Sequence, residues 1–234
     1  YKTPEEIRDA VAKGIIAIPA NINHTTLDPE GVGEGLRTKV NVNLGISGDL
    51  MDEEMELEKA RIALELGAEG IMDLSNHGKT REFRRKLLAM SSAMIGTVPM
   101  YDAIGYLEKP LIGITAQDFL DVIRAHAEDG VDFVTVHAGM NRRVIESFKE
   151  TGRLMNIVSR GGSLIFAWME ATGNENPFYE HYDEVLEILH EYDVTISIGD
   201  AMRPGCTYDA SDAGQIAELI EIGKLTKRAW DAGV

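Results

Sequence analysis

Short apolar runs rich in β-branched residues alternate with longer amphipathic stretches along almost the whole chain. Apolar residues that recur every three or four positions are typical of helices, and short apolar runs between turn residues are typical of buried strands. The short runs predict strands at residues 38–44, 70–74, 93–99, 131–136, 154–158 and 194–198. The amphipathic stretches predict helices at residues 51–66, 80–90, 119–129, 144–151, 164–171, 182–192 and 213–232.

This alternation predicts repeated βα units on a parallel sheet. Every connection is long enough for a crossover, and no Asn-Gly hairpin turn separates adjacent strands. An open doubly wound sheet is the alternative, but Gly45-Ile46-Ser47-Gly48 matches its glycine-rich phosphate turn poorly. We expect an α/β fold, a parallel (β/α)8 TIM-type barrel of which about six βα units are present. An N-terminal segment, residues 1–37, should pack on the partial barrel of residues 38–234.

The composition agrees with one soluble domain. The chain has 234 residues, 44% of them hydrophobic, and a net charge of −16 that opposes binding to nucleic acid or to an anionic membrane. No apolar run approaches the roughly 18 residues that span a bilayer, and no signal peptide is visible, so we expect a cytoplasmic protein. The basic residues within 79–86 are interpreted as a solvated helix face. Because the chain begins at Tyr1, we expect a trimmed or incomplete sequence.

Cysteine and histidine usage limits the metal chemistry of these residues. The single cysteine, Cys206, cannot form an intrachain disulfide and cannot alone ligate structural zinc or an iron-sulfur cluster. No two histidines have the spacing that would place them on one face of a helix as metal ligands. His126 and His190 lie in predicted helices and are interpreted as structural. We therefore expect no metal site within these residues.

Polar and small residues follow the predicted strands one after another. They are Asn41, Asn43, Met72, Asp73, Ser75, Tyr101, His137, Ser159, Arg160, Gly161, Gly162, Asp200 and Arg203. Barrel enzymes place their reacting groups where the strands end, since the βα loops converge there. Polar groups at the end of a buried strand need hydrogen-bond partners or a ligand. The pattern predicts a site for a small phosphorylated molecule at this end of the sheet.

Each group in the pattern suits a part of such a ligand. The run Ser159-Arg160-Gly161-Gly162 stands before a predicted helix, where free backbone N–H groups suit a phosphate. Its arginine, or Arg203, could add charge-assisted hydrogen bonds, and Asp200 could bind a ring nitrogen or an amine. His137 titrates near neutral pH and could shuttle a proton. Tyr101 could stack on a heterocycle.

These strand ends fall within seven longer motifs, which together extend over essentially the whole chain. The motifs occupy residues 18–24, 39–45, 70–75, 95–101, 136–139, 157–162 and 199–205. Through them the chain resembles the phosphomethylpyrimidine synthases and their paralogues. The resemblance implies a noncanonical radical S-adenosylmethionine enzyme with a (β/α) barrel, acting on 5-aminoimidazole ribotide.

The resemblance also implies which residues act. Substrate-binding residues would be Asn43, Met72, Tyr101, His137, Ser159, Arg160, Gly161, Asp200, Ala201, Met202 and Arg203, with His137 and Tyr101 also catalytic. The cofactors would be S-adenosylmethionine, a 4Fe-4S cluster held by three cysteines, and a divalent metal such as zinc held by two histidines. The ligands of the cluster and the metal are expected beyond residue 234. An external electron donor and a homodimer are expected by the same resemblance.

One departure bears on the product. After the second predicted strand the pyrimidine synthases usually read Ser-Thr-Gly-Gly, whereas this chain reads Ser75-Asn76-His77-Gly78-Lys79-Thr80. The altered loop favours the anaerobic 5-hydroxybenzimidazole synthases, which supply the lower ligand of cobalamin. The alternative is a phosphomethylpyrimidine synthase of thiamine biosynthesis. A second alternative is a noncatalytic ribotide-binding paralogue.

Overall fold

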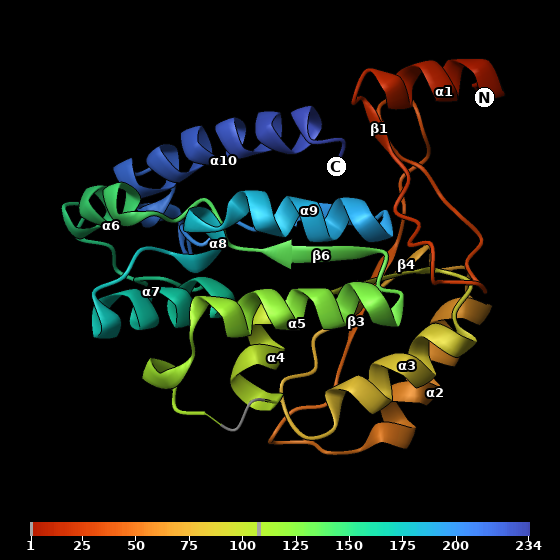
Figure 1. Cartoon of the computed structure of the whole chain (residues 1–234), viewed down its shortest axis with the longest axis horizontal. Helices are drawn as coiled ribbons and strands as arrows, with labels where there is room; N and C mark the ends of the chain where they lie inside the picture. The colour runs from red at the N-terminus through yellow and green to blue at the C-terminus, as the bar shows by residue number, and fades with distance from the viewer. Residues whose placement is uncertain (1, 107–108) are drawn as a thin grey trace.

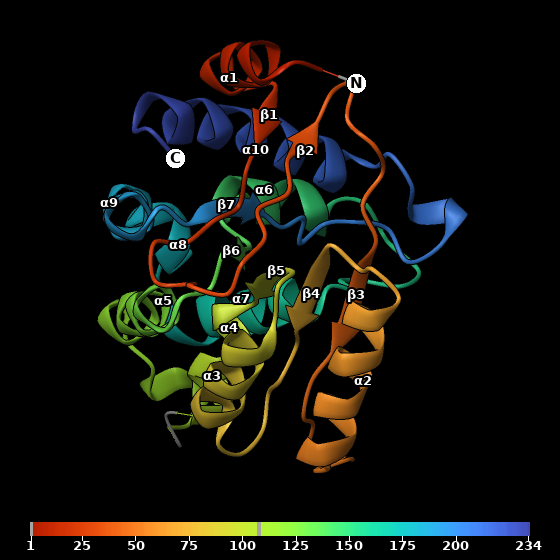
Figure 2. The same ribbon diagram turned by 90° about the vertical axis from the view of Figure 1, so that its right-hand side faces the viewer.

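The computed structural model describes residues 2–106 and 109–234, and its centre is one parallel sheet (Figures 1 and 2). The strands of this sheet are β3 (Asn41–Leu44), β4 (Gly70–Asp73), β5 (Met94–Thr97), β6 (Phe133–Val136) and β7 (Thr195–Ile198). They are hydrogen-bonded in sequence order, so β3 and β7 form the two edges of the described sheet. The α/β class and the parallel sheet are therefore confirmed, but a closed barrel is not seen.

Helices connect and cover the strands. They are α1 (Pro4–Ala12), α2 (Glu53–Glu65), α3 (Thr80–Met90), α4 (Pro99–Tyr106), α5 (Ala116–Asp129), α6 (Arg142–Lys149), α7 (Arg160–Thr172), α8 (Pro177–Glu180), α9 (Tyr182–Tyr192) and α10 (Ala213–Asp231). Short 3-10 turns occupy Leu111–Gly113 and Thr207–Asp209. Two short strands, β1 (Ile16–Ala17) and β2 (Val32–Gly33), pair antiparallel in the N-terminal segment. No described helix is long and apolar enough to cross a membrane.

The predicted strand at residues 154–158 is wrong. The chain is irregular there, and β6 pairs directly with β7. Asn156 has a φ of 53°, in the left-handed region that interrupts an extended strand. Leu154 and Met155 are exposed, and their backbone N–H groups both donate to the Asp209 carboxylate, at 2.9 Å each. An apolar run alone could not reveal this side-chain acceptor more than fifty residues away.

The connection after β5 contains a helix that the hydrophobic pattern did not predict. No helix was expected between residues 99 and 119, yet α4 begins at Pro99, directly after the strand, since proline is well suited to the first turn of a helix. Residues 107 and 108 of this connection lie outside the described residues. The helix matters for the site because it carries Tyr101.

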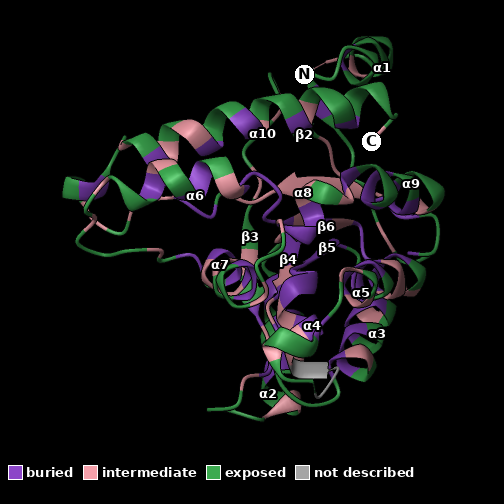
Figure 3. Ribbon diagram, turned by 60° about the vertical axis from the view of Figure 1, so that its left-hand side comes forward, coloured by how far each residue is buried: buried purple, intermediate pink, exposed green. Residues whose placement is uncertain are grey.

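The two faces of the sheet have different surroundings. One row of paired residues crosses all five strands, namely Asn43, Met72, Gly96, Phe133 and Thr195. These side chains share one face because alternate residues of a strand point the same way. Their neighbours Ile71, Ile95 and Val134 point to the opposite face and are fully buried. The central strands β5 and β6 accordingly show buried residues in Figure 3. The helices therefore cover the second face, and the row faces away from them.

A buried charge pair fixes the N-terminal segment to the sheet. The Asp132 carboxylate, fully buried just before β6, accepts the backbone N–H of Asn21 at 3.0 Å and that of Ile95 at 2.7 Å. His24 Nδ1 lies 2.7 Å from the same carboxylate, and its Nε2 lies 3.1 Å from the carbonyl oxygen of Ser91. Because both ring nitrogens face acceptors, both carry protons, and His24 is an imidazolium.

A second buried network corrects the interpretation of the basic run on α3. Arg84 is 2% exposed, and its guanidinium donates to Asp102 on α4 at 3.1 Å and to Asp129 on α5 at 2.9 Å. His126 Nε2 lies 2.9 Å from the same Asp102 carboxylate, while Nδ1 contacts Thr97 at the end of β5. Arg84 is thus a core residue, although other basic residues of the run are exposed.

The His24 pair predicts a pH-dependent contribution to stability. Burial alone would lower the pKa of His24, but the hydrogen bond and charge of Asp132 and the Ser91 carbonyl raise it above its usual 6.5. The stabilisation is therefore complete below pH 6.5 and is lost as the pH rises through the raised pKa. In urea unfolding, His24→Gln should cost about 3–5 kcal/mol at pH 6 and less at pH 9.

The exposed His190, on α9, provides the matched control for this measurement. His190→Gln should shift the free energy of unfolding little, because this side chain lies on the surface. A cost of His24→Gln that does not change with pH would show that His24 is held as a neutral ring.

Candidate functional site

The predicted site residues gather at the carboxyl ends of the strands, but some of them lie in strands, some just after a strand and some in the first turn of a helix. Asn43 and Met72 lie in β3 and β4 and are direct neighbours in the sheet. His137 follows β6 by one residue. Tyr101 lies in the first turn of α4 and Arg160 begins α7, so neither belongs to a strand.

His137 is the most enclosed titratable group among the predicted substrate-binding residues. It is 4% exposed, and its Nε2 lies 3.0 Å from Ser159 Oγ. A Cβ atom on Gly161 would come within 2.5 Å of His137 Nδ1, and one on Gly199 within 3.1 Å of Nε2. The ring therefore lies between the backbones of α7 and of the chain after β7. The ring leaves no room for a Cβ atom at position 161, and at position 199 a Cβ atom would also meet Thr135 Cγ2, at 2.9 Å.

The environment of His137 sets its protonation. Burial, and then the charge of Arg203, lower the pKa of His137 to about 4, so the ring is neutral near pH 7. Ser159 Oγ already accepts the N–H of Gly162 at 3.1 Å, so its own proton fits best on the line to Nε2. That arrangement puts the ring proton on Nδ1, a buried atom with no hydrogen-bond partner in the described structure.

Ser159 and the glycines form the start of α7. Ser159 is the N-cap, and its side chain is fully buried against the helix terminus and His137. Its hydroxyl therefore already has two partners within the protein. The helix start predicted at this run is present, and the first N–H groups of a helix favour a bound anion.

Arg160 and Tyr101 form a stacked pair beside this helix start. The guanidinium carbon of Arg160 lies 5.2 Å from the centre of the Tyr101 ring. Burial raises the pKa of Tyr101, although the charges of Arg160 and Arg203 and a backbone hydrogen bond from Gly161 lower it, and the hydroxyl stays protonated near pH 7. Arg160 and Arg203 therefore both lie close enough to Tyr101 for their charges to act on its hydroxyl.

The turn after β7 presents two side chains and buries two others. Ala201 and Met202 are fully buried, whereas the side chains of Asp200 and Arg203 are 56% and 43% exposed. Arg203 Nη1 donates to the carbonyl of Asp200 at 3.0 Å. The prediction had grouped all four as substrate-binding residues, and the structure places only the charged pair on the surface.

Sequence reasoning missed the residues that hold this turn. Glu218 on α10 accepts the backbone N–H groups of Ala201 and Met202, and Arg153 donates to the Met202 carbonyl. Glu218 lies within a helix, and nothing in the local sequence predicts that its side chain accepts hydrogen bonds from the backbone 16 residues earlier in the chain. For Arg84 a signal existed, because it lies three and four residues before the apolar Leu87 and Leu88, on the buried face of α3.

The described residues include no group of three or more histidine, cysteine, aspartate or glutamate side chains placed to hold a metal ion. Cys206 is partly exposed and is the one cysteine of the sequence. The donor set at the strand ends is instead cationic and rich in N–H groups, which suits a phosphate, while Asn43 and Asp200 suit the polar edge of a small ring.

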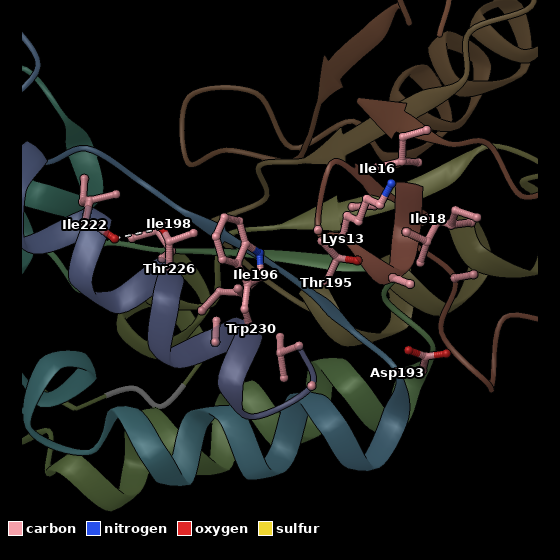
Figure 4. A pocket seen from close by; sticks show the side chains of 18 residues that line it. Lys13, Ile16, Ile18, Asp193, Thr195, Ile196, Ile198, Ile222, Thr226 and Trp230 are labelled. Atoms are coloured by element: carbon pink, nitrogen blue, oxygen red, sulfur yellow. Dashed lines mark hydrogen bonds between the residues drawn. The ribbon is translucent and has the colours of Figure 1, made fainter. Parts of the chain in front are cut away.

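An apolar cleft lies elsewhere in the molecule (Figure 4). It has a volume of about 800 Å³ and is lined by Ile196 and Ile198 of β7, Trp230 of α10, and Ile16 and Ile18 of the N-terminal segment, among others. It follows the open edge of β7 and includes none of the predicted site residues that the structure describes. Its lining is mainly apolar, which does not suit a phosphorylated ligand.

Comparison with known proteins supports the resemblance seen in the sequence. A model of the radical SAM ThiC family matches residues 2–234. The phosphomethylpyrimidine synthase of Alkaliphilus oremlandii is 62% identical over 230 residues, which are 98% of this chain and 53% of that protein. The phosphomethylpyrimidine synthase of Clostridium tetani is 62% identical, over 98% of this chain and 50% of that protein. The phosphomethylpyrimidine synthase of Pelotomaculum thermopropionicum is 61% identical, over 99% of this chain and 54% of that protein. The chain spans about half the length of these curated relatives.

These names correct one prediction. The expected 5-hydroxybenzimidazole synthase is wrong, because relatives at this identity are phosphomethylpyrimidine synthases. The loop that suggested it explains the error. His77, Gly78 and Lys79 are exposed, and the preceding residues are held by Ile46, whose backbone N–H donates to Ser75 Oγ at 2.9 Å. An exposed loop varies in sequence without changing the chemistry of the site.

Packing of His137 between two glycines gives a testable prediction. Gly161→Ala should force the ring or the start of α7 to move, at a cost of about 1–3 kcal/mol in urea unfolding. Gly223→Ala is the control, since Gly223 lies inside α10 with no atom within 4 Å of an added Cβ. That variant should gain about 0.5–1 kcal/mol from helix propensity. Equal effects of the two substitutions would show that His137 does not constrain position 161.

Proposed function

The chain belongs to the radical SAM ThiC family, and on that premise we propose that it forms the substrate-binding part of a phosphomethylpyrimidine synthase acting on 5-aminoimidazole ribotide. One observation carries the proposal. The Arg160–Tyr101 stack, Arg203 and the first turn of α7 lie together, so that cations and N–H groups serve a phosphate beside a surface for a small ring.

In this proposal the residues of the chain bind and orient the ribotide. Arg160, Arg203 and the α7 N-terminus hold the phosphate, and Tyr101 remains a neutral phenol that can hydrogen-bond or stack. His137 is neutral near pH 7, so it acts as a hydrogen-bonding group and not as a charged acid. Fixing the ligand against these groups supplies the proximity and orientation on which the reaction depends.

The radical chemistry of the family would come from S-adenosylmethionine and a 4Fe-4S cluster. A cluster of this kind needs several thiolates, and the residues of this chain do not fit it, because Cys206 is their only cysteine. The proposal therefore confines the role of these residues to the substrate. A divalent metal, an external electron donor, a homodimer and a complete eight-stranded barrel are further parts of the proposal that rest on the family resemblance.

Product analysis tests the function. The intact protein, reconstituted with its cluster and supplied with S-adenosylmethionine, a reductant and the ribotide, should yield a phosphorylated hydroxymethylpyrimidine, identified by mass. Protein without the cluster should bind the ribotide and form no product. Ribotide binding without turnover in the reconstituted protein would instead identify a noncatalytic paralogue, and absence of binding would reject the substrate.

Arg203 should contribute to binding through its charge. Arg203→Ala should weaken ribotide affinity about 10–100-fold, measured by calorimetry, as expected for one charge-assisted hydrogen bond. The same substitution removes the charge that lowers the pKa of His137, so the titration midpoint of His137 should rise above about 4 by NMR. Arg8→Ala, at a highly exposed position of α1, is the control and should change neither value. Unaltered affinity in Arg203→Ala would place the phosphate elsewhere.

A further inference from the structure

A buried glutamate on the last helix reaches the turn after β7. Glu218 is 1% exposed. One carboxylate oxygen accepts the N–H of Ala201 at 2.8 Å, and the other accepts the N–H of Met202 at 2.6 Å. Since a carboxylate has only acceptors, two adjacent N–H groups are a complementary partner for it. Glu218 thereby fixes the direction of two successive peptide groups.

The same turn is held from a second side. Arg153, whose side chain is 1% exposed, donates from Nη2 to the carbonyl of Met202 at 2.5 Å. It also forms a two-point ion pair with Asp212, with Nε at 2.6 Å and Nη2 at 2.8 Å from the two carboxylate oxygens. Asp212 is the N-cap of α10. Three backbone groups of the turn are therefore tied, directly or through Arg153, to one helix.

The helix also lies close to the end of β6. A Cβ atom on Gly139 would come within 3.0 Å of Glu218 Cγ and 2.6 Å of Ile222 Cγ1. Position 139 follows His137 by two residues, so α10 touches the ends of both strands that frame the site. Movement of Glu218 would therefore act on the His137 side of the site as well as on the turn.

We propose that Glu218 is a positioning residue, which holds the backbone of residues 200–203 so that the exposed side chains of Asp200 and Arg203 face the bound ligand. The proposal deepens the proposed function and rests on it for the identity of the ligand. The positioning role itself is a property of the protein without ligand, and it is testable in that state.

Protonation of Glu218 should make the hydrogen bonds that hold the turn depend on pH. Burial and, to a smaller extent, the nearby Asp200 carboxylate raise its pKa to about 7, against the two N–H groups and Arg153, which lower it. When Glu218 takes up a proton, one oxygen becomes a donor and one N–H loses its acceptor. The turn should therefore loosen as the pH falls below 7. Because the folded pKa exceeds the ordinary value of 4.5, global stability from this group rises over the same interval.

Amide hydrogen exchange tests the proposal. In the intact protein, protection factors for the N–H groups of Ala201 and Met202 should fall with a midpoint near pH 7 as the pH decreases, as the pKa of Glu218 dictates. Glu218→Gln should lower both factors at pH 8 by about tenfold or more and abolish the step. Ribotide affinity should weaken about tenfold at pH 8, since the turn is no longer held.

Glu221→Gln is the matched control. Glu221 is also a buried glutamate of α10, but it pairs with Lys224 at 2.7 Å. This variant should keep the protection of Ala201 and Met202, their pH step and the ribotide affinity. An equal loss in both variants would overturn the proposal, because the effect would then be general weakening of α10.

Two further outcomes decide separate claims. Unchanged protection at Ala201 and Met202 in Glu218→Gln would overturn the positioning role. If the wild-type protein does not bind the ribotide, the proposed substrate fails, while the exchange data still decide the role of Glu218. Should Glu218→Gln not fold, the pH series on the wild-type protein decides alone, and protection that shows no step overturns the proposal.

Discussion

The alternation of side chains along five parallel strands governs the rest of this molecule. One set of positions, with Ile71, Ile95 and Val134, is fully buried under the helices. The other set includes Asn43 and Met72 and faces away from them. Because all the strands run the same way, their carboxyl ends lie along one edge, and the residues that follow them are brought together whatever their distance in sequence.

Charge is distributed unevenly over this frame. The chain has a net charge of −16, yet its candidate site includes two arginines, Arg160 and Arg203. Arg84 and Arg153 are buried and neutralised by aspartates, so their charge serves packing. Arg160 lies on the Tyr101 ring, and among the described residues no carboxylate forms an ion pair with it. A cation kept apart from abundant acidic groups is available to an anionic ligand.

The sequence was sufficient for elements whose signal is local. The periodic runs predicted the five strands of the parallel sheet and most of the helices, within a few residues at each end. The polar residues after the strands predicted that these side chains cluster at one edge of the sheet. The strand expected at residues 154–158 failed because Asn156 adopts a left-handed backbone and Asp209 binds the neighbouring N–H groups. Glu218, Arg153 and the pair of His24 with Asp132 depend on partners 16 to 108 residues away, which no local pattern encodes.

The close packing of His137 has a consequence for the descent of this sequence. Gly161 is required because the imidazole fills the space that its side chain would take, whereas a Cβ atom at Gly199 would first meet Thr135 Cγ2, at 2.9 Å. Positions 137 and 161 are therefore not free to change one at a time, and an alanine at position 161 becomes neutral only after the ring has been replaced by something smaller. A lineage that lost His137 should also vary at position 161, and this correlated variation would record the loss of the histidine even where overall identity remained high.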